Sequence, residues 1–577
     1  MIKKTRNRLR PILLVLAISI LFLLFWVIAR HIIEPFLFGG YTIIQLILFG
    51  VIFACLLCLG KFFWIKLDNA RRYILVGCVV LLLTSIYYIT MTSLNDQDGQ
   101  RNFYPALADA FAHGQFHLIP LPSPELLALP DQYAPVDAPG KIWDALLFDG
   151  KYYFYFGPIP AIILLMVNGL FGTIAGNAFL MDLFLSLCAL MVFLIIYRIW
   201  QRKYQEVSWK VPMLCFMTVV LSFPVLWLVG RPSVYEAAIS GGQAFLLTGL
   251  YLLLLAFDEG KRRNLLLIGA GIAMGLAVGA RWSLAVPVIL LSILVLVLLF
   301  VPRSKINEFL KPVVAYFLPL TLLALCYGYY NFARFGSPFE FGGQFQLMGW
   351  GKATDYNSFS FKYLKNNLIL YGVIPPSDLS YQYPFITFAG TRDQVAHIYS
   401  IYGVMADPQH GYDNSDKFSA IIWLAPLSLA ALIPVVGLIK NISGFKLREV
   451  TKLSFIEWLG DKDQLYSILF FLAAFGGGIP LLLFFGTTMR YHMDYFPAVG
   501  LLAANGILYI FMKKISHTNL VFIKSLFFSF AVYTMVLGVV ASITADQYLF
   551  AATSPQVIDN LNAVIKICLG IFSQVKL

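Results

Sequence analysis

The chain has 577 residues, of which 59% are hydrophobic and only 12% charged, and its mean hydropathy is +0.77. Soluble domains carry roughly a quarter charged residues, so this composition excludes an ordinary soluble protein. The net charge of +12 would suit a nucleic-acid partner, but Lys and Arg stand in short clusters between apolar blocks, as in "KKTRNR" and "DEGKRR". That distribution is typical of the positive-inside rule, so we expect a lipid bilayer and no nucleic acid as partner.

Apolar blocks of about 20 residues recur along the chain, which is the length that a helix needs to cross roughly 30 Å of hydrocarbon. The sequence therefore predicts an all-α polytopic membrane protein with about thirteen transmembrane helices. The predicted crossings are 11–29, 41–60, 73–92, 177–197, 211–229, 238–257, 265–280, 284–301, 312–330, 418–439, 464–486, 495–512 and 519–543.

The basic clusters set the predicted orientation, with the N-terminus in the cytoplasm and the C-terminus outside. One apolar block, 158–176, does not fit as a crossing. If it and 177–197 both crossed, the cluster "RIWQRKYQEVSWK" would face outward, against the rule. We therefore expect 158–176 to form a juxtamembrane or re-entrant helix on the outer side.

This topology divides the chain into membrane-embedded and external segments, including two long structured external loops. The predicted segments are N-terminal helices 1–92, a first external loop 93–176 with juxtamembrane helices, a transmembrane core 177–330, a second external loop 331–417, C-terminal transmembrane helices 418–543 and an external tail 544–577.

An acidic pair, Asp96 and Asp98, opens the first external loop in "NDQDGQRNFYPALADAFAHGQF". Either residue could simply cap the helix predicted over 104–113. Two carboxylates just above the hydrocarbon boundary could instead orient and deprotonate a hydroxyl or amine nucleophile, or hold a cation. We favour a catalytic role for at least one of them, and the choice between the two stays open.

Three arginines stand at predicted helix ends on the same outer face. They are Arg281 in "VGARWSL", Arg334 in "YYNFARFGSPFEFGGQF" and Arg490 in "TTMRYHMDYFPAVGLL". A short-loop arginine or a surface salt bridge is the ordinary explanation for each. Three such positions at one face favour a phosphate-binding mouth, because guanidinium groups match phosphate oxygens.

Other polar and aromatic residues at the outer ends of predicted helices are further candidates for substrate binding. The segment "DGKYYFYFGPIPAIILL" contributes several of them, although its aromatic residues also suit an interfacial belt. The predicted substrate-binding residues are Arg281, Arg334, Arg490, Lys151, Asp149, Tyr153, Arg231, Glu236, Tyr491 and Asp494.

The sequence holds little sign of a resident metal or nucleotide. His113 and His117 have the spacing of a helical metal pair, but Gly114 between them indicates that the helix has already ended. Walker A, Rossmann, GxSxG and HExxH motifs do not occur in the sequence. We expect no nucleotide cofactor and no metal site built by the protein, while a divalent metal requirement stays open.

Taken together, the acidic pair, "NFYPALADAFAHGQFHL", "DGKYYFYFGPIPAIILL" and "RY" before a Pro-containing span resemble GT-C glycosyltransferases. That superfamily includes protein O-mannosyltransferases, the lipid A aminoarabinose transferase and oligosaccharyltransferase catalytic subunits. "YNFARFGSPFEFG" and "RYHMDYFPAVGLLAANG" resemble an uncharacterised bacterial branch of it. The chain departs from the pattern in two ways: two extra helices precede the acidic loop, and the acidic pair reads Asp-Gln-Asp.

The resemblance implies an enzyme of the inner bacterial membrane that uses a polyprenyl-phosphate-linked sugar on the periplasmic face. Its acceptor would be a glycan, a lipid or a protein, and the carboxylate role falls on Asp98 or Asp96. A base opposite the phosphate would invert the anomeric carbon. The alternative function is a transporter or flippase of a lipid-linked glycan, which would place ionisable groups near mid-membrane within inverted repeats.

Overall fold

The computed structural model describes residues 68–95, 102–134, 136–172, 175–258, 262–300, 306–348, 352–355, 357–380, 382–388, 417–444, 462–513 and 517–574. Within these ranges, eight helices are long and apolar enough to cross a membrane. These spans are Asn69–Asn95 (α3), Asn177–Lys203 (α7), Val234–Asp258 (α10), Arg263–Ala280 (α11), Trp282–Phe300 (η3 and α12), Phe309–Phe335 (in α13), Gln464–Leu483 (in α19) and Val521–Thr544 (in α21).

Three of these spans are parts of longer helices, because α13, α19 and α21 each begin a few residues before the span that they contain. The other elements are shorter than these spans or lie outside them. In chain order the elements are α4 (Phe103–Ala112), α5 (Pro124–Leu127), β1 (Leu146–Phe148), β2 (Lys151–Tyr153), α6 (Ile159–Phe171), α8 (Lys210–Val220), α9 (Phe223–Val229), η3 (Trp282–Leu284), α12 (Ala285–Phe300), α13 (Ile306–Phe335), η4 (Gly343–Phe345), η5 (Ala353–Asp355), η6 (Phe361–Tyr363), α14 (Leu364–Val373), β3 (Asp378–Leu379), β4 (Ile386–Thr387), α16 (Ile421–Leu424), η8 (Pro426–Ala431), α17 (Leu432–Gly444), α19 (Lys462–Leu483), η9 (Met489–Asp494), α20 (Phe496–Met512), α21 (His517–Thr544), α22 (Gln547–Thr553) and α23 (Pro555–Gln574).

The prediction of a multi-span helical membrane protein is confirmed, whereas the count of thirteen crossings is not. The predicted crossings 11–29 and 41–60 lie outside the described residues. Eight of the others correspond to the eight spans. The block 495–512 forms α20, which has 17 residues, and the blocks 211–229 and 418–439 are interrupted.

A proline lies at each of the two interruptions. At 211–229 the chain forms α8 and α9, which are bent by 44° at a break that Pro224 follows. At 418–439 the helix α16 ends at Leu424, two residues before Pro426, and the chain continues as η8 and α17. Proline lacks an N–H and disfavours helical geometry in the preceding residue, which favours the end of a helix at these positions. Proline does not always have this effect, since α13 continues through Pro312 and Pro319.

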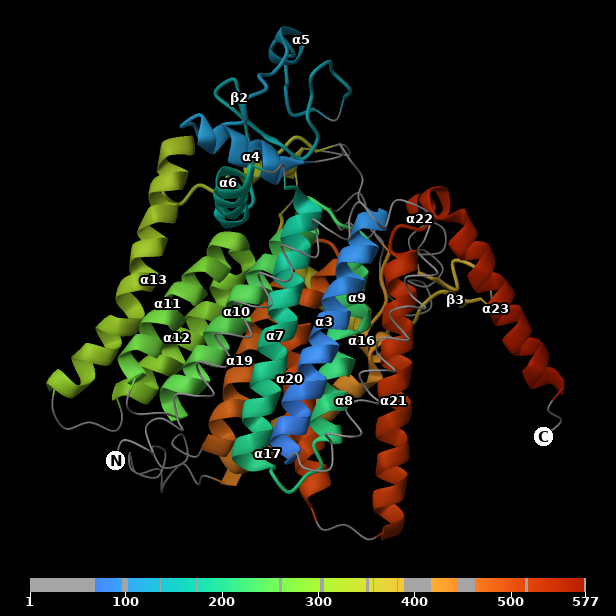
Figure 1. Cartoon of the computed structure of the whole chain (residues 1–577). Coiled ribbons are helices and arrows are strands. Elements are labelled where there is room, and N and C mark those ends of the chain that lie inside the picture. Colours follow the sequence, from blue (N-terminus) through green and yellow to red (C-terminus); the bar gives the residue numbers. More distant parts are fainter. Residues whose placement is uncertain are drawn as a thin grey trace.

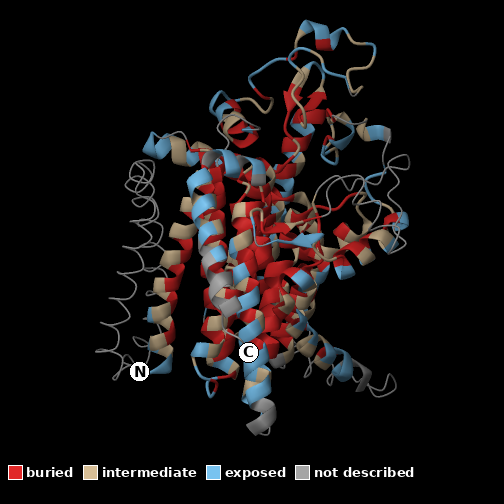
Figure 2. Cartoon of the chain, turned by 90° about the vertical axis from the view of Figure 1, so that its right-hand side faces the viewer, coloured by how far each residue is buried: buried red, intermediate tan, exposed pale blue. Residues whose placement is uncertain are grey.

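The core of the bundle is built around α7, which packs against α3 and α10, while α10 also packs against α11. The apolar window of α7 is 89% buried, whereas that of α13 is only 11% buried, so α7 is central and α13 lies at the rim. Figure 2 shows the buried residues concentrated along the centre of the bundle. Small residues allow the close packing: a side chain at Gly241 would overlap the ring of Phe184.

The segment predicted to form the first external loop lies beyond one end of the bundle, where Figure 1 shows α4, α5, β2 and α6 together. The strands β1 and β2 form an antiparallel hairpin. The helix α6 has 13 residues and ends at Gly172 in a left-handed conformation. It is too short for a crossing, as expected of a juxtamembrane helix, and its depth in a membrane stays a prediction.

The segment predicted to form the second external loop and the predicted C-terminal tail both contain regular secondary structure. After α13 the chain forms η4, η5, η6, α14 and a small hairpin of β3 and β4, which pair in antiparallel register. Residues 389–416 lie outside the described ranges. The predicted tail 544–577 carries the helices α22 and α23, which Figure 1 shows at the side of the bundle.

Candidate functional site

A cavity of about 360 Å³ lies where the two predicted external loops meet the ends of helices. Its volume is in the range of small-molecule binding sites. Three of the sequence-predicted residues line it, namely Arg281, Arg490 and Tyr491. The other lining residues are Asp144, Tyr155, Phe156, Tyr235, Trp282, Ser283, Gln346, Met348, Phe359, Pro480, Leu481, Phe484, Phe485, Gly486, Thr487 and Thr488.

Arg281 lies in the turn between two membrane-spanning helices, α11 and the helix formed by η3 and α12. Helix α11 ends at Ala280, and Arg281 takes an extended conformation before η3 starts the next span. Its guanidinium makes a two-point ion pair with Asp494, with Nε–Oδ1 and Nη2–Oδ2 distances of 2.7 and 2.6 Å. Both residues are buried, so the carboxylate offsets the cost of removing a guanidinium from water.

The backbone of Asp494 is itself fixed by two neighbouring helices. The side-chain amide of Gln243 in α10 donates a hydrogen bond to the carbonyl of Asp494 at 2.9 Å. In α19, a Cβ at Gly477 would lie 2.2 Å from the same carbonyl oxygen, so only glycine permits this approach. The ion pair thus joins the α11–α12 corner to η9, while α10 and α19 hold the backbone of Asp494. Asp494 is not among the residues that line the cavity.

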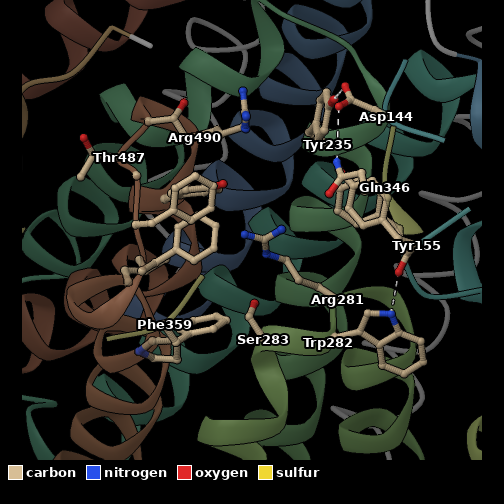
Figure 3. A pocket seen from close by; sticks show the side chains of 18 of the residues that line it. Asp144, Tyr155, Tyr235, Arg281, Trp282, Ser283, Gln346, Phe359, Thr487 and Arg490 are labelled. Atoms are coloured by element: carbon tan, nitrogen blue, oxygen red, sulfur yellow. Dashed lines mark hydrogen bonds between the residues drawn. The ribbon is translucent and has the colours of Figure 1, made fainter. Parts of the chain in front are cut away.

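Arg490 and Arg281 share one aromatic neighbour. Their guanidinium carbons each lie 5.6 Å from the ring centroid of Tyr491, and that of Arg490 lies 4.7 Å from the ring of Tyr235. These distances are within the range of cation–π attraction. Figure 3 shows the two arginines between Tyr235, Asp144 and Gln346 on one side and Thr487 on the other. Two cationic groups therefore meet at one aromatic wall.

His492 holds the short helix η9 that carries Arg490 and Tyr491. Its Nε2 lies 2.8 Å from the carbonyl oxygen of Ser419, and its Nδ1 lies 2.6 Å from the hydroxyl of Tyr495. A carbonyl only accepts, so we assign the proton to Nε2 and expect Tyr495 to donate to Nδ1. Burial lowers the pKa of His492 to about 4, so the ring is neutral at neutral pH. His492 lies outside the eight helices that could cross a membrane.

Asp144 is the carboxylate that lines the cavity, and it was not among the predicted site residues. It has a positive φ of 66° and lies just before β1. One carboxylate oxygen accepts a hydrogen bond from the hydroxyl of Tyr235, and the other accepts one from the amide of Gln346 at 3.4 Å. Figure 3 shows this group facing the side of the cavity that holds Arg490. A non-glycine residue in this conformation is uncommon, but the sequence alone does not reveal it.

Tyr155 and Trp282 connect the segment after β2 to the corner between α11 and α12. The indole N–H of Trp282 donates to the carbonyl of Tyr155 at 2.9 Å. Burial, together with nearby Tyr235 and Asp144, raises the pKa of Tyr155 well above its usual range, so its hydroxyl stays protonated. Just beyond, a Cβ at Gly157 would lie 1.9 Å from the carbonyl oxygen of Gly279. This close contact joins the segment after β2 to the last turn of α11.

Two predicted residues lie apart from the cavity, buried in other contacts. Arg334 donates hydrogen bonds at 2.6 Å to the carbonyl of Phe154 and to Asn331, and its guanidinium lies 3.9 Å from the ring centroid of Tyr330. It therefore joins α13 to the segment after β2. Glu236 is fully buried in the first turn of α10 and accepts a hydrogen bond from Ser233. Substrate binding by either stays a prediction.

The remaining predicted residues belong to the β1–β2 hairpin and to the α9–α10 connection. Asp149 and Gly150 form the hairpin turn with positive φ angles, and Lys151 begins β2. Tyr153 is buried, with its ring centroid 5.4 Å from that of Phe335. Arg231 is half-buried between the two helices. None of these four predicted residues lines the cavity, and their role stays a prediction.

The acidic pair Asp96 and Asp98 lies outside the described residues, so its catalytic role stays a prediction. The helix α4 begins after Asn102, whose side chain makes no capping hydrogen bond. The helix ends at Ala112, so His113 and His117 do not form a helical pair. In the described ranges, no group of three or more His, Cys, Asp or Glu side chains is arranged to hold a metal ion.

No protein-family model and no curated protein sequence matches this chain. Among solved structures it is similar to the oligosaccharyltransferase of Archaeoglobus fulgidus. The apo form matches with a TM-score of 0.46 and 13% identity over 81% of this chain and 56% of the other. The complex of that protein, AglB, with an inhibitory peptide and a dolichol-phosphate matches with a TM-score of 0.46 and 12% identity, over 82% and 56%.

The chain thus spans little more than half the length of the oligosaccharyltransferase that it matches. Oligosaccharyltransferases are among the proteins that the sequence motifs resemble. At this identity and TM-score, no shared reaction or substrate follows from the similarity.

Proposed function

We propose that the chain is an integral-membrane glycosyltransferase of the GT-C type. It moves a sugar from a polyprenyl-phosphate-linked donor to a glycan, lipid or protein acceptor on the non-cytoplasmic face. The observation that carries the proposal is the pair of guanidinium groups, Arg281 and Arg490, at one aromatic ring of a cavity that lies at the ends of apolar helices. A lipid-linked substrate explains why such a cavity lies beside a membrane.

The two arginines would bind the donor phosphate in different ways. Arg281 is fixed by Asp494, so it presents its charge in one orientation. Arg490 stands between the rings of Tyr235 and Tyr491, which hold its side chain by cation–π attraction. Guanidinium groups make paired hydrogen bonds to phosphate oxygens, and this geometry suits a phosphodiester better than a lysine would.

The proposed reaction is a direct displacement at the anomeric carbon. The acceptor oxygen or nitrogen bonds to that carbon while its bond to the phosphate oxygen breaks, and the electron pair leaves with the polyprenyl phosphate. The acceptor proton passes to a carboxylate. Negative charge thus grows on the phosphate, where Arg281 and Arg490 would stabilise it more strongly in the transition state than in the bound donor. Attack opposite the phosphate gives inversion.

Asp98 or Asp96 is our choice for the carboxylate that takes the proton. Asp144 lies in the cavity itself, so it is a further candidate for orienting the acceptor. The hydrogen bond from Tyr235 fixes its carboxylate, which suits a group that positions a hydroxyl. The wall also carries Tyr155, Trp282 and Phe359, whose rings could stack on the faces of sugars.

Transfer from radiolabelled polyprenyl-phosphate-linked sugars tests the proposal. Purified protein would be incubated with a panel of such donors and an unlabelled cell-envelope fraction as acceptor. We expect label to move to the acceptor in the wild type and to be lost with Arg490→Ala. The variant Arg262→Gln, an exposed residue at the start of α11, is the control. Lipid that crosses the bilayer of vesicles without sugar transfer would instead establish the flippase alternative.

A further inference from the structure

A second cavity, of about 610 Å³, lies at the opposite end of the bundle from Arg281 and Asp494. Three helix ends surround it: Lys203 ends α7, Lys440 lies in the last turns of α17, and Lys513 follows α20. The first turns of α19 complete the wall. Figure 1 shows α17 at the end of the bundle that is far from α4 and α6. This cavity is therefore separate from the proposed catalytic site.

A buried chain of polar groups lies beneath this cavity. The hydroxyl of Tyr204 donates to Oδ1 of Asn505 at 2.9 Å, and Nδ2 of Asn505 donates to the hydroxyl of Ser467 at 3.0 Å. All three residues are buried and line the cavity. Because each is hydrogen-bonded to a partner from another helix, the floor holds α19 and α20 to the end of α7 in one arrangement.

Lysines surround the cavity, and none of the described residues that line it is acidic. The ammonium of Lys513 lies 4.6 Å from the ring centroid of Tyr509, and that of Lys203 lies 5.3 Å from the ring of Tyr204. Lys440 and Lys513 are exposed, while Lys203 is half-buried. The described lining thus holds three basic side chains, which favours an anionic ligand.

One wall of the cavity is apolar and open to the surroundings of the bundle. Leu432 is 59% exposed and Val436 46% exposed, one turn apart on α17, and both line the cavity. Ile439 continues this face and is 59% exposed. A soluble phosphate ester would gain nothing from such a wall, whereas an acyl chain would bury it. Charge and apolar surface thus occur side by side, as a phospholipid requires.

We propose that this cavity binds the phosphate headgroup of an anionic phospholipid, with an acyl chain along Leu432 and Val436. Basic pockets between transmembrane helices are a known way of binding anionic headgroups. The lipid would connect α17, which follows the break at Pro426, to the ends of α7 and α20. It would therefore stabilise the fold without taking part in sugar transfer.

Thermal unfolding of the full-length protein in a neutral detergent tests this inference, and native mass spectrometry measures the lipid affinity. The probes are dioleoyl phosphatidylglycerol, dioleoyl phosphatidylcholine and soluble glycerol phosphate. We expect phosphatidylglycerol alone to raise the unfolding temperature and to stay bound. Equal stabilisation by phosphatidylcholine would show that the charge is irrelevant, and equal stabilisation by glycerol phosphate would show a soluble ligand. Either result would overturn the proposal.

Two double variants, each lacking two lysines, test whether the lipid binds in this cavity. The double variant Lys440→Gln/Lys513→Gln should bind phosphatidylglycerol roughly thirtyfold more weakly, since each lysine near an anionic headgroup contributes about 1 kcal/mol. The control Lys210→Gln/Lys524→Gln removes two exposed lysines outside the cavity, one at the start of α8 and one in the third turn of α21. Its affinity should change less than threefold. Equal losses in the two double variants would contradict a specific site.

Discussion

Arg281 and Asp494 are 213 positions apart in the sequence, yet they form a buried two-point ion pair with N–O distances of 2.7 and 2.6 Å. The pair connects the corner between α11 and α12 to the short helix η9. On the cavity side of this pair lies Arg490, four residues before Asp494. The position of the second arginine therefore depends on the ion pair of the first.

Breaking this ion pair from one side should destabilise the protein strongly. Arg281→Gln or Asp494→Asn leaves an unpaired buried charge, which typically costs about 3–5 kcal/mol of unfolding free energy. The double variant should lose less than the sum of the single losses, because neither charge is then left alone. Unfolding in mixed detergent micelles measures these free energies. The exposed pair Arg71 and Asp68 is the control, where Arg71→Gln should change little.

Arg490 should matter for activity more than for stability. Arg490→Lys keeps the charge but loses the planar fork, so we expect kcat/KM for the lipid-linked donor to fall by roughly tenfold to a hundredfold. The unfolding temperature should stay within a few degrees of the wild type. Steady-state transfer at varied donor concentration measures the first quantity. A variant with unchanged kcat/KM would show that Arg490 does not contact the donor.

Tyr235 should act through Asp144. Tyr235→Phe removes the hydroxyl that donates to this carboxylate while it retains the ring beside Arg490. We expect an increase of about tenfold in the KM for the acceptor, with little change in the KM for the donor. Asp144→Asn should have the same selective effect. If both variants instead raise only the donor KM, Asp144 does not orient the acceptor.

Acid should destabilise the protein through His492. In the unfolded chain a histidine takes up a proton near pH 6.5, whereas burial lowers the pKa of His492 to about 4. Between these values the unfolded state binds more protons, so stability falls as the pH is lowered. The loss from pH 7 to pH 5 is roughly 2 kcal/mol.

Replacement of the histidine separates this contribution from other acid effects. His492→Gln keeps a donor for the carbonyl of Ser419 but cannot titrate, so its stability should depend less on pH over this range. His113→Gln removes an exposed histidine and should retain the wild-type slope. Thermal unfolding at pH 5 and pH 7 gives both slopes. Identical slopes for His492→Gln and the wild type would exclude the histidine as the acid-sensitive group.

Hydropathy was sufficient to predict most of the fold because the bilayer requires long apolar helices. Eight predicted crossings match observed spans, and the short helix α6 lies where the charge rule excluded a crossing. Two apolar blocks that were predicted as single spans are interrupted beside Pro224 and Pro426. Hydropathy averages over a window, so it does not show which proline ends a helix, and α13 continues through Pro312 and Pro319.

The site was only partly predictable, because its contacts join distant segments. Arg281, Arg490 and Tyr491 were recognised from their place at helix ends, and they line one cavity. Arg334 has the same local pattern but is taken up by Phe154 and Asn331. Asp144 was missed because its partner Tyr235 is 91 residues away. Charge at a helix end is visible in sequence, whereas the pairing of loops is not.

The most direct test of the proposed function is transfer from a radiolabelled polyprenyl-phosphate-linked sugar by purified Asp96→Asn and Asp98→Asn variants. Arg262→Gln serves as the control. We expect at least one aspartate variant to lose transfer by a factor of a hundred or more while it still binds the donor, since a general base contributes roughly 10²–10⁴ to the rate. Full transfer by both variants would contradict the catalytic assignment. Absence of transfer by the wild type with every donor, together with lipid translocation in vesicles, would contradict the glycosyltransferase itself.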